Sequence, residues 1–176
     1  MKYKLLVVDI DGTLVDKRGI VSARDKEELA QASAAGIYIS LCTGRVSQAC
    51  SRVMSQVSLD SYHIFADGAI VCNPKQCQEV YVRPVRPEVV RQAVEFAQEH
   101  DIDLELYSTT HYFARRETWS TNAHREFFGL EPTIVDFDGL WERERIIKAG
   151  MAVTNQEETT KAKKLHRAFD GRLSIS

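Results

Sequence analysis

The chain has 176 residues, which is the size of one domain or of two small ones. Its 23 basic and 25 acidic side chains give a formal net charge of -2, which argues against nucleic acid and against an anionic membrane surface as partners. With 44% hydrophobic and 27% charged residues, the composition is that of a globular protein and excludes a disordered or fibrous one. Four cysteines are too few for a disulfide scaffold and no apolar segment reaches membrane-spanning length, so we expect a cytoplasmic protein.

Strands and helices are predicted to alternate in the first third of the chain. Residues 5–10 form a continuous apolar run, typical of a strand buried on both faces of a parallel sheet. Further strands are predicted at 37–42 and 63–66, and helices at 22–35, with Ser22 as the N-cap, and at 47–57. This β-α-β-α-β order predicts an α/β fold whose three core strands are parallel.

A different pattern begins near Glu79, where the segment Arg83-Pro84-Val85-Arg86-Pro87 interrupts the chain. We therefore predict two domains, a core at 1–78 and an α+β domain at 79–176. The second domain is predicted to contain helices at 87–100, 118–128 and 157–169, and strands at 102–107, 111–115, 145–153 and 172–175.

Two carboxylates end the first predicted strand. Asp9 and Asp11 are two residues apart, so on an extended strand their side chains leave on the same side, at the sheet edge where open α/β folds bind ligands. Gly12 would permit close approach of the backbone to a ligand. One carboxylate could act as a nucleophile while the other moves a proton. A plain Asp11-Gly12 turn with Asp9 as its cap explains the same residues equally well at this point.

A second polar group follows the second predicted strand. Thr43, Gly44 and Arg45 offer a hydroxyl, a backbone N–H and a guanidinium, which suit the oxygens of a phosphoryl group. Taken alone, Thr43-Gly44 reads more simply as a strand-to-helix connection with Thr43 as a cap. Because both groups fall at the ends of two strands of one parallel sheet, a shared ligand site becomes the better explanation of the two together.

The segment Asp9-Ile10-Asp11-Gly12-Thr13-Leu14 resembles the first motif of haloacid dehalogenase (HAD) superfamily phosphatases. Thr43-Gly44-Arg45, with Ser47 near it, is similar to the second motif in the Cof-type branch, and Ala66-Asp67-Gly68-Ala69 is similar to that branch's Asn-Gly-Ala segment before its cap. The resemblance implies a Rossmann-like HAD core followed by an α+β cap domain, and it covers the whole chain.

Phosphoryl transfer through an aspartyl-phosphate is what this resemblance implies for function. Asp9 would be the nucleophile, and Asp11 would protonate the leaving oxygen and then activate water. Mg²⁺ would be held by the Asp9 carboxylate and the Asp11 backbone carbonyl, and the substrate would be a small phosphorylated metabolite. The residues implied to bind the phosphoryl group are Gly12, Thr13, Thr43, Gly44 and Arg45.

Three departures from the family pattern limit the activity we expect. The family's later Lys and its Gly-Asp-x-x-Asn-Asp segment have no convincing counterpart in this sequence. The last predicted cap strand ends close to Ser176, so the chain resembles a HAD phosphatase truncated after its cap. We therefore expect weak Mg²⁺ binding, poor catalysis by this chain alone, and self-association through an unpaired edge of the strand from Leu5 to Asp9. Asp67 stands where the family has Asn, which makes it a further candidate metal ligand.

Other functions remain open on the sequence. A non-catalytic relative that binds phosphorylated ligands or a partner would keep the same motifs without turnover. A phospho-acceptor domain of the receiver type would use Asp67 instead of Asp9, although the spacing of Asp9 and Asp11 does not favour it. Four aromatic or histidine side chains are candidate cap contacts to substrate, with burial in a core as the more common role of such residues: Tyr107, His111, Tyr112 and Trp119.

Overall fold

The computed structural model describes residues 3–169, and the chain divides into two compact units. The first unit ends at Val82 and also includes Phe127–Gly129, and the second begins at Arg83. The predicted division lies a few residues earlier, between 78 and 79. The division into a core domain at 1–78 and a cap domain at 79–176 stays a prediction, and each unit is described by itself.

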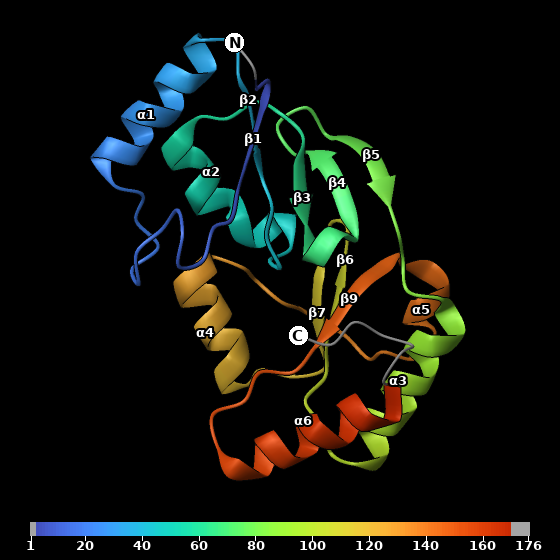
Figure 1. The fold of residues 1–176 in the computed structure, drawn as a ribbon. Helices are drawn as coiled ribbons and strands as arrows, with labels where there is room; N and C mark the ends of the chain where they lie inside the picture. The colour runs from blue at the N-terminus through green and yellow to red at the C-terminus, as the bar shows by residue number, and fades with distance from the viewer. Residues whose placement is uncertain (1–2, 170–176) are drawn as a thin grey trace. The chain divides into compact units, whose positions relative to one another are not determined.

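A parallel pair of strands forms the start of the first unit (Figure 1). β1 (Leu5–Val8) pairs with β2 (Tyr38–Leu41) in the register Leu5 to Tyr38 and Val8 to Leu41. The crossover between them contains α1 (Ala23–Ala34), which packs against β2. The predicted N-cap is confirmed, because the Ser22 hydroxyl oxygen accepts a hydrogen bond from the Asp25 N–H at 3.0 Å.

The third predicted strand joins this sheet through a short contact. β3 (His63–Phe65) bridges to Cys42 at Ile64 in the parallel sense, and the Thr43 N–H donates to the Ile64 carbonyl at 3.0 Å. The predicted second helix is present as a 3₁₀ turn at Ser47–Cys50 followed by α2 (Ser51–Val57).

Two antiparallel strands that the sequence pattern did not indicate follow β3. β4 (Ile70–Asn73) pairs with β3 and with β5 (Gln78–Val82), so these three strands form an antiparallel sheet (Figure 1). The tight connection at Ala66–Gly68 contains left-handed backbone, which lets the chain reverse within a few residues. The first unit is therefore a parallel pair extended by an antiparallel meander.

Burial of β1 on both faces, which its apolar sequence predicted, is wrong for the described chain. Leu5, Leu6 and Val7 are 58%, 39% and 47% exposed. The cause is the sheet topology: β1 has β2 on one side, and no strand among residues 3–169 pairs with its other edge. An apolar strand with one free edge is a surface suited to a further strand.

The second unit contains a four-stranded sheet in the order β8-β7-β6-β9. Its strands are β6 (Glu105–Ser108), β7 (Tyr112–Ala114), β8 (Thr133–Ile134) and β9 (Ile146–Gly150). The hairpin of β6 and β7 was predicted, whereas β8 was not. The predicted strand at 172–175 lies outside the described residues.

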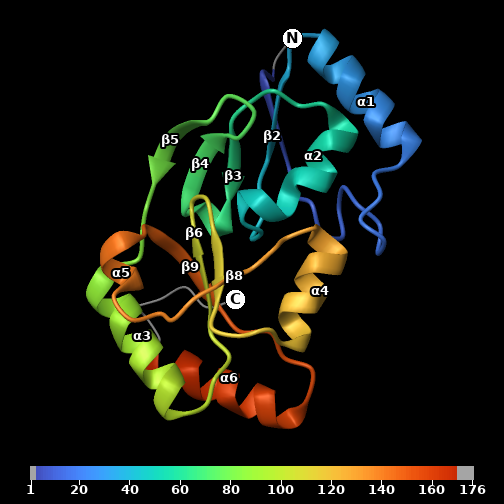
Figure 2. The same ribbon diagram turned by 180° about the vertical axis from the view of Figure 1, so that it is seen from behind.

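Four helices belong to this part of the chain. They are α3 (Pro87–Glu99), α4 (Trp119–Phe128), α5 (Leu140–Arg143) and α6 (Gln156–Phe169). α3 begins with proline at its first position and packs against α5, α6 and β9; α3 and α6 lie beside one another in both views (Figure 2). The core between helices and sheet includes Val90, Val94, Leu106, Phe113 and Phe137.

The mixture of parallel and antiparallel sheets with helices confirms the predicted α/β class with an α+β second part. None of the helices within residues 3–169 combines the length and the apolar character that crossing a membrane requires.

Candidate functional site

The carboxyl end of β1 presents two carboxylates to solvent. Ile10 is fully buried, whereas Asp9 and Asp11 on either side of it are exposed. The Thr13 hydroxyl donates to Asp9 Oδ2 at 3.4 Å, and Gly12 has the positive φ of +75° that glycine adopts readily. The same-side placement of the two carboxylates stays a prediction, because β1 ends at Val8 and Ile10 lies in a turn.

Arg45 binds Asp11 with two hydrogen bonds, which brings the two sequence motifs together. The Arg45 Nε donates to Asp11 Oδ2 at 2.8 Å, and its Nη2 donates to Oδ1 of the same carboxylate. The guanidinium is the less exposed partner, with 14% of its side chain exposed against 58% for Asp11. A planar guanidinium that meets both carboxylate oxygens fixes the direction of the acid as well as balancing its charge.

Thr43 is the first residue of the second motif, Thr43-Gly44-Arg45, and a hydrogen bond within this motif fixes its hydroxyl. Its side chain is buried, and its hydroxyl oxygen accepts a hydrogen bond from the Arg45 N–H at 3.2 Å. A hydroxyl that accepts in this way retains a proton of its own that it can donate. Thr43 is not the N-cap of the helix that follows, because Val46 has that position, so the hydrogen bond from Arg45 shapes the turn and is compatible with a role of Thr43 toward a phosphoryl oxygen.

Asp67 is brought beside Gly44 by two backbone hydrogen bonds. The Ala66 N–H donates to the Arg45 carbonyl at 2.8 Å, and the Asp67 N–H donates to the Thr43 carbonyl at 3.3 Å. A Cβ atom placed on Gly44 would lie only 2.7 Å from Asp67 Oδ1. Gly44 therefore has no room for a side chain while Asp67 keeps this position, and the third motif lies directly against the second.

The chemistry of the available oxygens fits a hard divalent cation only in part. The Asp9 carboxylate and the Asp11 backbone carbonyl are oxygen ligands of the kind that Mg²⁺ accepts. Among residues 3–169, however, no three His, Cys, Asp or Glu side chains gather closely enough to hold a metal ion. A Mg²⁺ ion at this place would have one or two carboxylates of the described residues as ligands and would need water or substrate for the others.

Two buried thiols and one buried imidazole in the same unit are poor candidates for catalysis. Burial raises the pKa of Cys50 to about 12 and that of Cys72 to about 11, so both remain thiols at neutral pH. His63 is fully buried, and its Nδ1 accepts a hydrogen bond from the Leu41 N–H at 3.1 Å. Burial lowers the pKa of His63 to about 4, so its role is structural.

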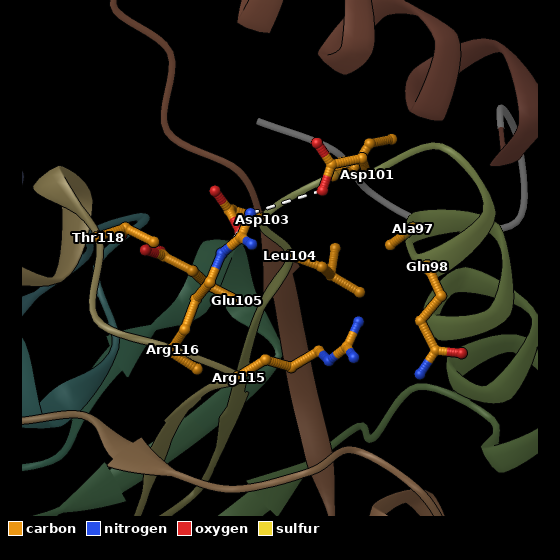
Figure 3. A pocket seen from close by; sticks show the side chains of 11 residues that line it. Ala97, Gln98, Asp101, Asp103, Leu104, Glu105, Arg115, Arg116 and Thr118 are labelled. Atoms are coloured by element: carbon orange, nitrogen blue, oxygen red, sulfur yellow. Dashed lines mark hydrogen bonds and ion pairs between the residues drawn. The ribbon is translucent and has the colours of Figure 1, made fainter.

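A pocket of about 250 Å³ lies in the second unit, between the end of α3 and strands β6 and β7 (Figure 3). Arg116 forms ion pairs there with Asp103 at 2.7 Å and Asp101 at 3.5 Å. Arg115 reaches across the pocket toward Gln98 (Figure 3). None of the residues selected from the sequence lines this pocket, so it is separate from the cluster at the end of β1.

The candidate cap contacts divide into buried and exposed residues. Tyr107 and Tyr112 are buried and stack at 4.9 Å, whereas His111 is exposed and Trp119 is 42% exposed. Both tyrosines donate hydrogen bonds to the buried carboxylate of Glu105, at 2.6 and 2.8 Å. Glu105 was not among the residues selected from the sequence, although an acid directly followed by the apolar pair Leu106 and Tyr107 in a predicted strand is the signal that could have indicated it.

Comparison with known proteins identifies the family. The profile of the haloacid dehalogenase-like hydrolases matches residues 6–176. Among curated proteins of Bacillus subtilis, the chain is 29% identical to YxeH over 123 residues, which cover 68% of this chain and 43% of YxeH. It is also 30% identical over 66 residues to the 5-amino-6-(5-phospho-D-ribitylamino)uracil phosphatase YcsE, covering 38% of this chain and 26% of YcsE.

Solved structures show the same fold at low sequence identity. A haloacid dehalogenase-like hydrolase from Bacteroides thetaiotaomicron superposes with a TM-score of 0.78 at 17% identity, covering 97% of this chain and 66% of that one. The subclass IIB sugar phosphatase BT4131 superposes with a TM-score of 0.72 at 21% identity, covering 93% of this chain and 62% of that one. The chain thus spans about half or less of the curated relatives it matches and about two thirds of the solved ones. By the family profile and the fold together, it belongs to the haloacid dehalogenase-like hydrolases, as the motif at Asp9–Leu14 predicted.

Proposed function

We propose that this chain carries the nucleophile and the phosphoryl-binding groups of a phosphatase that hydrolyses small phosphorylated metabolites through an aspartyl-phosphate on Asp9. The observation that supports it most strongly is the pairing of Arg45 with Asp11 beside an exposed Asp9, because it joins two separate motifs at one strand end. Open α/β sheets bind their ligands at this end of their strands.

In the proposed reaction, an oxygen of Asp9 attacks phosphorus while the P–O bond to the leaving alcohol breaks. Thr13 donates to Oδ2 of Asp9, which leaves Oδ1 as the attacking atom. Asp11 in its protonated form gives its proton to the departing oxygen, and its carboxylate then takes a proton from the water that hydrolyses the aspartyl-phosphate. Because Arg45 donates to both oxygens of Asp11 and so favours the ionised carboxylate, Asp11 must exchange this contact for the substrate before it carries a proton, which also frees the Arg45 guanidinium for the phosphoryl oxygens.

The phosphoryl oxygens would be bound by the groups around the second motif. The Thr43 hydroxyl, the Gly44 backbone and the Arg45 guanidinium supply donors, and Gly12 and Thr13 provide the facing backbone. Mg²⁺ held by the Asp9 carboxylate and the Asp11 carbonyl, with Asp67 as a further candidate ligand, would neutralise charge on the transferring group.

The proposed substrates are phosphate esters of small polar metabolites such as phosphorylated sugars. The name of YcsE describes a phosphatase for a phosphoribityl compound, and BT4131 is described as a sugar phosphatase. Both compounds join a phosphate to a polyhydroxylated carbon chain, and this shared chemistry supports the proposal for the present chain.

Hydrolysis of an aryl phosphate in the presence of Mg²⁺ tests the proposal. We expect slow turnover, since the sequence offers no Gly-Asp-x-x-Asn-Asp segment to complete the metal site, and we expect Asp9→Asn to abolish it. Glu28→Gln removes one exposed carboxylate on α1 and should leave the rate unchanged. Turnover that persists in Asp9→Asn would remove the basis of the proposal.

A further inference from the structure

Two carboxylates of the chain itself lie on the groups proposed to bind phosphate. The Arg45 guanidinium is engaged by Asp11, and Gly44 lies against Asp67. Both are carboxylates from other segments of the chain, 34 residues before Arg45 in one case and 23 residues after Gly44 in the other. The carboxylates of Asp11 and Asp67 therefore lie at Arg45 and Gly44, where a bound phosphoryl group would also place negative charge.

The position of Asp67 is fixed by the backbone rather than by the freedom of its side chain. Ala66 and Asp67 both have left-handed φ values, +50° and +55°, which residues other than glycine rarely adopt in succession. Hydrogen bonds from their N–H groups to the carbonyls of Arg45 and Thr43 hold this segment against the second motif. Two adjacent residues in a disfavoured conformation, tied to a candidate site, are the kind of local strain that functional sites retain.

The charge of Asp67 has a direct consequence at Gly44. An amide N–H or a guanidinium attracts a phosphate dianion, whereas the Asp67 carboxylate, whose Oδ1 lies 2.7 Å from the position of a Cβ on Gly44, repels it. Asn has nearly the same shape as Asp and tolerates left-handed backbone equally well, so the charge is what distinguishes the two residues at this position.

We propose that Asp67 is an affinity-determining residue, whose carboxylate lowers the affinity of the Thr43–Arg45 segment for phosphate dianions by acting as a competing anion at Gly44. The inference rests on the proposed function, because it assumes that this segment binds phosphate. A substrate or product phosphate must then bind against the field of Asp67, which weakens retention of the inorganic phosphate that hydrolysis releases.

The test is a titration with inorganic phosphate, followed by ³¹P NMR, with EDTA present so that no divalent cation contributes. We expect Asp67→Asn to bind phosphate about tenfold more tightly than the unaltered chain, which corresponds to ~1.4 kcal/mol. Glu28→Gln, which removes an equal charge from an exposed position on α1, should leave the dissociation constant unchanged. A gain in affinity is a readout that loss of structure does not produce, and a thermal melt of each variant confirms its folding.

Arg45→Gln separates failure of this inference from failure of the proposed function. If phosphate binds the unaltered chain and Asp67→Asn equally well, and Arg45→Gln weakens binding, the phosphate site stands and the role assigned to Asp67 is wrong. If Asp67→Asn loses Mg²⁺ binding and gains no phosphate affinity, Asp67 is a metal ligand and the inference is overturned. If neither the unaltered chain nor Asp67→Asn binds phosphate, both the inference and the phosphoryl site fall.

Discussion

At the level of single residues, the pairing of Arg45 with Asp11 is what joins the first motif to the second. Asp11 follows β1 and Arg45 follows β2, and the carboxyl ends of these parallel strands meet at one edge of the sheet. The contact between Arg45 and Asp11 joins residues 34 apart and depends on side-chain directions that no local pattern encodes. The position of Asp67 against Gly44 was equally hidden, since it requires two left-handed residues in succession.

His63 gives a prediction at this scale. Its pKa falls from an ordinary value of 6.5 to about 4 in the folded chain, because the imidazolium would be buried without water. Between pH 6.5 and pH 4, His63 is protonated in the unfolded chain but stays neutral in the folded one. The free energy of unfolding therefore decreases as the pH falls from 6.5 toward 4. Urea unfolding should show a loss of ~2 kcal/mol from this residue between about pH 7.5 and about pH 5.

His63→Gln is the matched variant, because an amide oxygen can still accept from the Leu41 N–H while the group no longer titrates. The difference in unfolding free energy between the two chains should narrow as the pH is lowered over this range. A difference that stays constant would show that His63 is accessible to protons in the folded chain.

At the level of elements, boundaries set by local chemistry were predicted well and pairings set by tertiary contacts were not. Helix α1 was found within a residue of its predicted ends because Ser22 caps it and Gly36 follows it. β4 and β5 were missed because their antiparallel pairing depends on contacts between the strands: β3 reaches β4 through the left-handed Ala66 and Asp67, and a short turn after Asn73 leads from β4 to β5. The apolar sequence of β1 indicated a central strand, whereas the described chain leaves one of its edges free.

The buried acid of β6 gives a prediction for the second unit. Glu105 accepts hydrogen bonds from the hydroxyls of Tyr107, Tyr112 and Ser120, and His124 Nδ1 lies 3.6 Å from its Oε2. Replacing Glu105 by Gln turns one of the two accepting carboxylate oxygens into an NH₂ group, which cannot accept a hydrogen bond from the tyrosine and serine hydroxyls that face it. We expect a loss of ~1–3 kcal/mol in the free energy of unfolding measured in urea.

Glu95→Gln is the control for this loss, because Glu95 is exposed on α3 and forms only a surface pair with Arg91. Its effect should stay within about 0.5 kcal/mol. Equal stability of the Glu105 and Glu95 variants would mean that the three hydroxyls contribute nothing to the unit.

At the level of the whole molecule, the fold is that of a HAD-like core with an α+β second unit. β1 presents apolar side chains beside an edge with which no strand within residues 3–169 pairs. A strand of this kind pairs readily with a strand from a second copy. We therefore expect concentration-dependent self-association in analytical ultracentrifugation.

The double variant Leu5→Lys with Val7→Lys should shift this equilibrium toward the monomer, since it places charge on side chains that are 58% and 47% exposed. Ile20→Lys is the matched control, because Ile20 is 48% exposed but lies in a loop. A monomeric unaltered chain at high concentration, or equal association in all variants, would contradict a role for the β1 edge.

The most direct measurement of the central claim maps the residue that receives the phosphoryl group. The chain is incubated with Mg²⁺ and a small phosphoryl donor such as acetyl phosphate, the acyl phosphate is reduced with borohydride, and the modified residue is located by mass spectrometry. The account predicts modification at Asp9 that is absent in Asp9→Asn. Modification at Asp67 with Asp9 untouched, or no modified aspartate at all, would contradict it.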